Sequence, residues 1–385
     1  MLSLVSSLIT FVVFMNIAVN INPHTEAQGE FYQYMLQLVF QVANLQQAHT
    51  FYLIHEKEND SSQSLPSNIE WLQLKPITSG PISWKYWYSI KMPLLLRKIK
   101  ADVVVSINGR ASLTTTVPQL LCIRDISFLE QPDLYKQSQS RYFKKNTIKF
   151  LQKARFLICF SLFMKEKIIS HFKLNPQKVE VVIPQSVLAG LSVSNEEKEK
   201  IKLQYADGKE YFLYAGDLDL RHQLLQLLKA FSLFKKRQRS TWKLVLAGTS
   251  SDAALVKMLE TYKYKEDVVL LTISHLERST LVAAAYAFIT PAYSEGFTLA
   301  TNDALQAGIA VLAPAESAAG DLLGEAGLLF NPNSPEDMAD KMMWVYKNEA
   351  GRKELIQKGV AVAEQLADVP SIEQFWNAIM KTAST

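Results

Sequence analysis

The chain has 385 residues, 48% of them hydrophobic and 20% charged, and its formal net charge is +4 at pH 7. This length allows two domains of ordinary size, and the composition is that of a folded globular protein and not of a disordered one. The two cysteines, Cys122 and Cys159, lie in apolar runs and the six histidines have no ligand spacing, which argues against a disulfide framework and a structural metal. No glycine-rich dinucleotide motif or P-loop follows a strand, so hydride transfer and P-loop chemistry have little support.

The first 25 residues contain no charged side chain. Residues 1–14 are apolar apart from three serines and a threonine, and they lack the basic flank of a signal peptide. This run is also shorter than the ~20 residues that a membrane-spanning helix needs. We interpret Met15 as the natural start and residues 1–14 as a misassigned extension, with a short membrane anchor as the alternative.

Apolar segments of strand type alternate with helical segments along the chain. The predicted strands of the first half are residues 16–21, 50–55, 103–106, 119–123, 156–160 and 179–183. Those of the second half are residues 211–215, 243–247, 268–271, 288–290, 310–312 and 327–330. The helical stretches include residues 31–46, 91–100, 163–172, 224–236, 252–262 and 336–347.

This alternation predicts an α/β protein with parallel sheets and right-handed crossovers. Twelve strands are too many for one compact sheet, so we expect two doubly wound domains, residues 15–195 and 196–370, with the polar segment 192–209 at their boundary. A ligand cleft should open between them at the carboxyl ends of the strands. Ser334 before Pro335 predicts a helix start, and residues 371–374 are typical of a capping box for a last helix.

The most informative segment is residues 293–303, with the sequence YSEGFTLATND. The apolar run 287–291 before it predicts a buried strand, and residues 299–307 predict a helix stopped by Gly308. Backbone N–H groups at such a helix start bind anions, and Gly296 allows a ligand to approach the main chain. Glu295 at the turn and Asp303 in the helix then suit a ligand with phosphates and many hydroxyls, such as a nucleotide-sugar.

This segment resembles the E-x7-E signature of retaining, nucleotide-sugar-dependent glycosyltransferases of the GT-B fold, family 4 (glycosyl transferases group 1). Residues 211–216, 224–231, 244–248, 284–287 and 324–332 resemble the same family, in order, across residues 205–365. Residues 15–20, 122–128 and 178–184 resemble its strands and cleft loops more loosely. The resemblance implies two facing Rossmann-like domains, a helix at residues 371–385 that crosses back to the N-terminal domain, and no bound metal or cofactor.

For the donor site, the resemblance implies that Glu295 contacts the sugar hydroxyls and that Asp303 holds the ribose. The N–H groups of Phe297, Thr298 and Leu299 would cradle the phosphates.

The same resemblance assigns three further residues to donor binding, namely Gly216, Arg221 and His222. Arg221 and His222 follow the strand that ends at Gly216 and are expected to face the diphosphate. Arg221 can bind phosphate oxygens with two N–H groups at once, which makes it a catalytic candidate together with Glu295.

The N-terminal half contributes three candidates that face the sugar or the acceptor. Arg124 and Asp125 stand where the family often has His-Asp. Gly29, before the first helix, corresponds to the glycine loop that lets donor and acceptor approach each other.

The implied function is transfer of a hexose from a nucleotide-diphosphate-sugar to a glycan or lipid-linked acceptor, with retention, in cell-envelope polysaccharide synthesis. Four positions depart from the family pattern: Arg124, His222, Thr298 and Asp303. They leave open a catalytically degenerate protein that binds or scaffolds. A third hypothesis is a nucleotide-sugar epimerase or hydrolase with the same fold.

The charge is unevenly distributed. Residues 85–155 carry 14 Lys and Arg against four acids, a local charge of +10 that leaves −6 for the remainder. One hypothesis is that this domain contacts an anionic membrane, which would place a cytoplasmic protein at the inner face of the membrane, or that it faces an anionic acceptor. The alternative is a set of solvated helix faces. No recognition motif accompanies the charge, so a nucleic-acid partner is not predicted.

Overall fold

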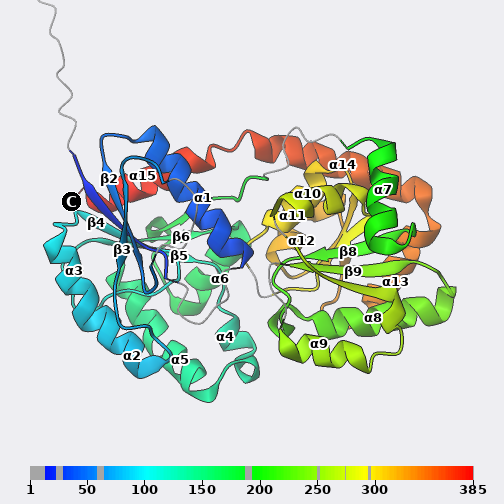
Figure 1. Cartoon of the computed structure of the whole chain (residues 1–385), viewed down its shortest axis with the longest axis horizontal. Coiled ribbons are helices and arrows are strands. Elements are labelled where there is room, and N and C mark those ends of the chain that lie inside the picture. The colour runs from blue at the N-terminus through cyan, green and yellow to red at the C-terminus, as the bar shows by residue number, and fades with distance from the viewer. Residues whose placement is uncertain are drawn as a thin grey trace, which may run out of the picture.

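The computed structural model describes residues 14–22, 29–58, 65–186, 193–248, 252–273, 275–293 and 296–384. They form two α/β domains side by side, each built around a parallel sheet (Figure 1). The predicted fold class is confirmed. Residues 1–13 and Glu295 lie outside the described residues, and so does the side chain of Arg221.

The N-terminal domain contains a sheet of seven parallel strands in the order β3-β2-β1-β4-β5-β6-β7. Its strands are β1 (Asn16–Asn20), β2 (Thr50–His55), β3 (Ile69–Gln73), β4 (Val103–Ser106), β5 (Gln119–Ile123), β6 (Phe156–Cys159) and β7 (Val179–Val181). The sequence did not predict β3, which is a half-exposed edge strand paired only with β2. An edge strand tolerates polar residues, so its apolar pattern is weak.

The C-terminal domain contains a sheet of six parallel strands in the order β10-β9-β8-β11-β12-β13. Its strands are β8 (Tyr211–Ala215), β9 (Lys243–Gly248), β10 (Val268–Thr272), β11 (Ala287–Ile289), β12 (Ala310–Pro314) and β13 (Leu328–Phe330). All six correspond to predicted strands. Near-continuous burial of the central ones is typical of a parallel sheet covered on both faces.

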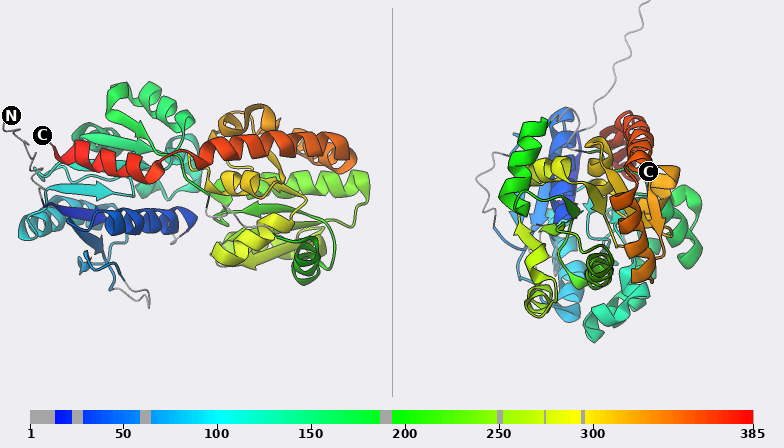
Figure 2. Two further views of the ribbon diagram at one scale, coloured as in Figure 1. Left: turned by 90° about the horizontal axis from the view of Figure 1, so that it is seen from above. Right: turned by 90° about the vertical axis from the view of Figure 1, so that its right-hand side faces the viewer.

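Helices cover both faces of each sheet (Figure 2). In the N-terminal domain they are α1 (Glu30–Leu45), α2 (Pro81–Tyr86), α3 (Met92–Lys98), α4 (Ser127–Glu130), α5 (Gln137–Lys153) and α6 (Leu162–Phe172), with a π-helical turn at Trp87–Lys91 between α2 and α3. In the C-terminal domain they are α7 (Asn195–Ala206), α8 (Leu224–Gln238), α9 (Ala253–Glu260), α10 (His275–Ala284), α11 (Leu299–Gln306), α12 (Ala318–Leu323), α13 (Pro335–Lys347) and α14 (Glu349–Ala367). The charged boundary segment is thus mostly helix α7.

Two predicted helix starts have different outcomes. Ser334 caps α13, since its hydroxyl accepts a hydrogen bond from the N–H of Asp337 at 3.1 Å. The capping box predicted for the last helix is wrong. That helix, α15 (Ser371–Ala383), has Pro370 at its cap position, and the Ser371 hydroxyl donates instead to the carbonyl of Ile183 at 2.6 Å. A tertiary contact has therefore taken the side chain that the local pattern assigned to the cap.

Helix α15 belongs spatially to the N-terminal domain, although it follows the second domain in sequence (Figures 1 and 2). Its buried residues Phe375, Ala378 and Ile379 are part of the core formed by β1, β4 and α1. The return of the chain ties the two domains together. Within the described residues, no helix has the length and apolar character needed to cross a membrane.

Candidate active site

The carboxyl ends of strands from both sheets meet between the domains, and Asp217, which follows β8, lies at their meeting point. Its Oδ2 is 3.4 Å from Nη1 of Arg124, in the loop after β5, and 3.9 Å from Nε2 of His222. Its Oδ1 accepts a hydrogen bond from the N–H of Glu30 at 3.4 Å. A Cβ added at Gly29 would lie 2.1 Å from the same carboxylate oxygen, so a larger residue there would displace the Asp217 side chain. The structure therefore brings together three predicted site residues, Gly29, Arg124 and His222.

The loop after β5 holds Arg124 and Asp125 as a charged pair, with 2.9 Å between Nε and Oδ2. Asp125 also accepts hydrogen bonds from the N–H and the hydroxyl of Ser127, at 3.0 and 2.5 Å. Burial favours the neutral acid, but Arg124 and the Ser127 hydrogen bonds outweigh it and lower the pKa of Asp125 to about 2. Asp125 is thus a fixed anion that orients Arg124 toward the C-terminal domain.

The loop before α11 packs directly against the N-terminal domain. The N–H of Gly296 donates to the carbonyl of Arg124 at 3.0 Å, and a Cβ at this position would meet that carbonyl at 2.6 Å. Phe297 enters the N-terminal core, with its ring centroid 5.2 Å from that of Phe31 and 5.9 Å from that of Phe160. These contacts fix the start of α11 against the opposite domain.

The predicted helix after this loop is confirmed as α11, which Thr298 precedes as the cap residue. Thr298 has φ −116°, an ordinary value for a β-branched residue, so its departure from the family pattern introduces no backbone strain here. Thr298 and Leu299 are buried, and the first turn of α11 presents its backbone N–H groups at this end of the helix. Arg221 is in a short 3₁₀ turn after β8.

Asp303 is completely buried, and its carboxylate bonds side chains of other segments. Its Oδ2 is 2.5 Å from Nη2 of Arg278 on α10, and its Oδ1 accepts a hydrogen bond from the hydroxyl of Ser186 at 2.7 Å. Arg278 also pairs through Nη1 with the carboxylate of Glu30. Burial opposes the charge of Arg278, but these two carboxylates raise its pKa above the ordinary value. The ribose role that the resemblance implies for Asp303 stays a prediction, because this arrangement uses the carboxylate within the protein.

A narrow pocket lies between the two domains at the carboxyl ends of β8 and β11. The C-terminal domain lines it with Gly216 and Asp217 after β8, Thr290 after β11 and Thr301 of α11, and Glu30 of α1 closes it from the opposite domain. Gly216, Phe297 and the first turns of α11 are therefore placed around one space, as the predicted donor site requires. No cluster of three or more His, Cys, Asp or Glu that could hold a metal occurs in the described part of the chain.

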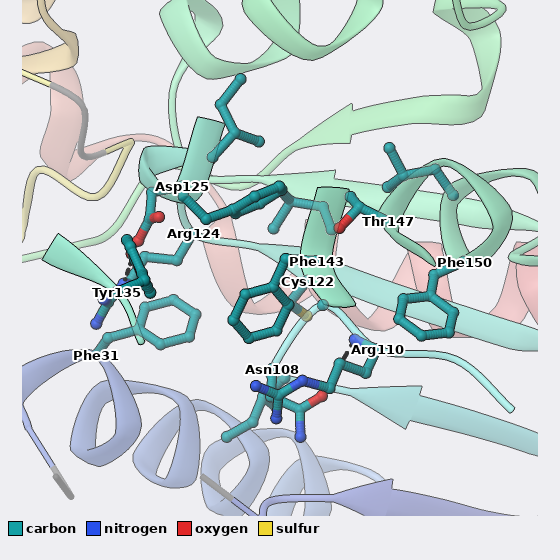
Figure 3. Close-up of a pocket in the computed structure, with 16 residues that line it drawn as sticks. Phe31, Asn108, Arg110, Cys122, Arg124, Asp125, Tyr135, Phe143, Thr147 and Phe150 are labelled. Atoms are coloured by element: carbon teal, nitrogen blue, oxygen red, sulfur yellow. Dashed lines mark hydrogen bonds and ion pairs between the residues drawn. The ribbon is translucent and has the colours of Figure 1, made fainter. Parts of the chain in front are cut away.

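A second cavity extends from the domain contact into the N-terminal domain (Figure 3). Arg124 and Tyr135 lie toward one end of it and Phe150 toward the other, with Arg110 and Asn108 along one side (Figure 3). All of its lining residues belong to the N-terminal domain.

Three residues of the site were not predicted: Asp217, Glu30 and Arg278. Asp217 could have been suspected, because it directly follows the strand and glycine that resemble the family. Glu30 follows Gly29 and was interpretable only as a helix-start acid. Arg278 lies on an unremarkable polar helix, and its contacts reach residues 248 positions before it and 25 after it, which no local pattern shows.

Comparison with known proteins agrees with this geometry. Residues 195–361 match the model of the family described as Glycosyl transferases group 1. The chain is 24% identical over 254 residues to the O-antigen chain mannosyltransferase B of Escherichia coli, a match that covers 63% of this chain and 65% of that protein. The match thus spans less than two thirds of the curated relative.

Solved structures show the same architecture. The crystal structure of WaaG, a glycosyltransferase involved in lipopolysaccharide biosynthesis, superposes with a TM-score of 0.75 at 17% identity, covering 96% of this chain and 100% of that one. Alr3699/HepE of Anabaena, in complex with UDP-glucose, gives 0.73 at 13% identity, with 96% and 100% coverage. The chain therefore has the GT-B fold. The family match in its second domain supports a GT-B glycosyltransferase.

Proposed function

We propose that this protein transfers a sugar from a nucleotide-diphosphate-sugar to a hydroxyl group of a glycan or lipid-linked acceptor. The observation that carries the proposal is the cavity at the carboxyl ends of β8 and β11, beside the start of α11 and closed by α1 of the opposite domain. It lies largely in the domain that matches the Glycosyl transferases group 1 family. Ligands of open α/β sheets bind in this position.

The diphosphate of the donor would lie at the start of α11, where the N–H groups of Phe297, Thr298 and Leu299 and the helix dipole favour an anion. Arg221, in the turn after β8, would neutralise the leaving diphosphate, with His222 beside it. Glu295 would orient the sugar hydroxyls. No step of this scheme uses a metal or another cofactor.

The proposed reaction keeps the anomeric configuration. The bond between the anomeric carbon and the diphosphate oxygen breaks, and its electron pair stays on the diphosphate. The acceptor hydroxyl attacks the anomeric carbon from the face that the diphosphate leaves, and its proton passes to a diphosphate oxygen. Stabilising the leaving group is the protein's main contribution, because charge develops there in the transition state.

The curated relative suggests which sugar and pathway to examine first. It is named an O-antigen chain mannosyltransferase, so we propose mannose as the first donor sugar to test and a cell-envelope polysaccharide as the product. Since the reactive cavity lies between domains, the acceptor would enter from the N-terminal side, through the space that Arg124 borders.

The N-terminal domain also has a surface that suits an anionic membrane at the cytoplasmic face. A groove between α2 and α5 is lined by Lys85, Arg141, Lys145 and Lys149, and Ile82 beside them is 88% exposed. Basic side chains around exposed apolar ones are typical of a peripheral membrane contact. Sedimentation with vesicles tests it: we expect binding to vesicles rich in anionic lipid and none to neutral ones, and equal binding to both would reject this surface.

The alternative is a catalytically degenerate GT-B protein that binds or scaffolds. The ion pair between Arg278 and Asp303 favours this alternative, because the carboxylate that would bind the ribose already bonds another side chain of the protein.

An assay of nucleotide release decides between these functions. The full chain is incubated with GDP-mannose or UDP-sugars, with and without glycan acceptors. Acceptor-dependent release that Glu295→Ala or Arg221→Met abolishes supports the transferase, and the anomeric configuration of the product tests retention. Glu325→Ala, an exposed acid of the same domain, is the matched control. Release without acceptor would indicate a hydrolase, and no release with any donor would favour the degenerate protein.

A further inference from the structure

Arg110 is an almost fully buried cation whose charge has no anionic partner in the described part of the chain. Its side chain is 4% exposed, and no ion pair with a carboxylate involves it there. Within the same residues, its Nε and Nη1 atoms are buried without a hydrogen-bond partner. Buried arginines are ordinarily paired, because removing a charge from water is costly unless a counter-ion compensates.

Two aromatic rings hold the guanidinium in a fixed place. Its central carbon is 4.6 Å from the ring centroid of Trp84 and 5.1 Å from that of Phe143. Such contacts engage the flat faces of the group, and its N–H donors point outward in the plane. The rings and a hydrogen bond with the Tyr88 hydroxyl therefore hold Arg110 in place. Within the described residues, Nε and Nη1 remain without a hydrogen-bond partner.

These donors lie at the second cavity. Arg110 follows β4 and lines this cavity together with Asn108 and Thr147, and Arg124 lies toward its end near the C-terminal domain (Figure 3). Phe150 lines both this cavity and the basic groove between α2 and α5. Arg110 is thus located between the domain contact and a positively charged surface.

We propose that Arg110 binds an anionic group of the acceptor, a phosphate ester or a carboxylate, in the cavity that extends from Arg124 to Phe150. The inference rests on the proposed transferase function, since it defines the acceptor of that reaction. The planar fork of N–H groups fits two oxygens of one phosphate or carboxylate. The bound anion would supply the counter-charge that Arg110 lacks, and it would place the acceptor on the side of the cleft that faces the donor.

Anion binding is tested first, independently of catalysis. The probes are inorganic phosphate and diphosphate, and the readout is the melting temperature of the full chain with the donor site saturated by nucleotide, so that only a second site responds. We expect wild type to be stabilised and Arg110→Met to lose roughly tenfold or more in apparent affinity. Arg97→Met, which removes one exposed arginine of the same domain, should bind like wild type.

Stability without anion separates a binding residue from a packing residue. If Arg110 is an anion-binding residue, the melting temperature of Arg110→Met without anion should equal or exceed that of wild type without anion, because the substitution removes a buried cation that has no counter-ion in the described residues. Arg110→Lys keeps the positive charge but lacks the planar set of N–H donors, so it should bind the anion more weakly than wild type. This variant replaces Arg110→Met in the test if the methionine variant does not fold. Anion binding that neither variant weakens, or no anion-dependent shift in wild type, would overturn the proposal.

The acceptor class is tested by transfer assays with three acceptors: a polyprenyl-diphosphate-linked glycan, a soluble glycan that contains a uronic acid, and a neutral glycan. We expect Arg110→Met to raise KM for the anionic acceptor about tenfold or more with little change in kcat and donor KM. Preference for the diphosphate-linked glycan identifies a phosphate as the bound group, and preference for the uronic-acid glycan identifies a carboxylate. Equal use of the neutral glycan by wild type and variant, with no preference for an anion, would overturn the acceptor assignment. Absence of transfer in every protein would reject the proposed function, and the anion-binding result would still stand.

Discussion

Arg278 of α10 forms a buried ion pair with Glu30 of α1, so a charged contact joins the two domains beside the pocket at the carboxyl ends of β8 and β11. The same guanidinium bonds Asp303, the second acid of the signature segment. One arginine therefore links α1 of the N-terminal domain to the signature helix α11.

Replacing Arg278 by methionine should destabilise the protein strongly. The substitution leaves Glu30 and Asp303 buried without their cation, and breaking a buried pair in this way costs about 3–5 kcal/mol. Arg237→Met is the matched control, since its pair with Asp340 is exposed and such pairs contribute about 0–1 kcal/mol. Denaturant unfolding measures both, and equal effects of the two substitutions would contradict the role of Arg278.

Gly296→Ala should separate the domains locally. The added Cβ would lie 2.6 Å from the carbonyl oxygen of Arg124 and 2.7 Å from Cβ of Met164, so one domain has to shift. We expect a loss of about 1–3 kcal/mol and weaker donor binding. Gly80→Ala is the control, because a Cβ there meets nothing within 4 Å. Melting temperatures that are the same for both variants would show that the Gly296 contact does not restrain the structure.

Asp125 should make stability depend on pH in the acid range. Its pKa is about 2 in the folded protein against an ordinary 3.8, so the unfolded chain takes up the proton first. The contribution of about 2 kcal/mol is complete above about pH 5 and is lost as the pH falls toward 2. The difference in unfolding free energy between wild type and Asp125→Asn should therefore shrink below about pH 4. A constant difference down to pH 3 would contradict this origin, and exposed Asp133→Asn controls for the loss of one charge.

Much of the fold could be predicted from the sequence, because the strands of a parallel sheet are buried on both faces and stand out as apolar runs. The strand that was missed, β3, contains Glu70 and Gln73 and lies at an edge, where this signal is weakest. The capping box at Ser371 failed for a different reason. Its pattern is local, but the hydroxyl bonds Ile183, which is distant in sequence.

The site was predictable only in part. Gly29, Arg124 and His222 were selected from three separate segments, and the structure brings them to one carboxylate, that of Asp217. Asp217 itself was not selected, since an acid after a strand is common on surfaces. The surroundings of Arg278 and of Arg110, which has no ion pair in the described residues, depend on long-range packing, which periodicity and spacing do not reveal.

The most direct test of the account is the melting temperature of the full chain during titration with GDP- and UDP-sugars, because a ligand that binds the folded state must raise it. We predict a saturable increase with one donor, with mannose the first sugar to examine, that Glu295→Ala abolishes and Glu325→Ala preserves. No increase with any nucleotide-sugar at millimolar concentration, or an increase that survives in Glu295→Ala, would contradict a donor site at the start of α11.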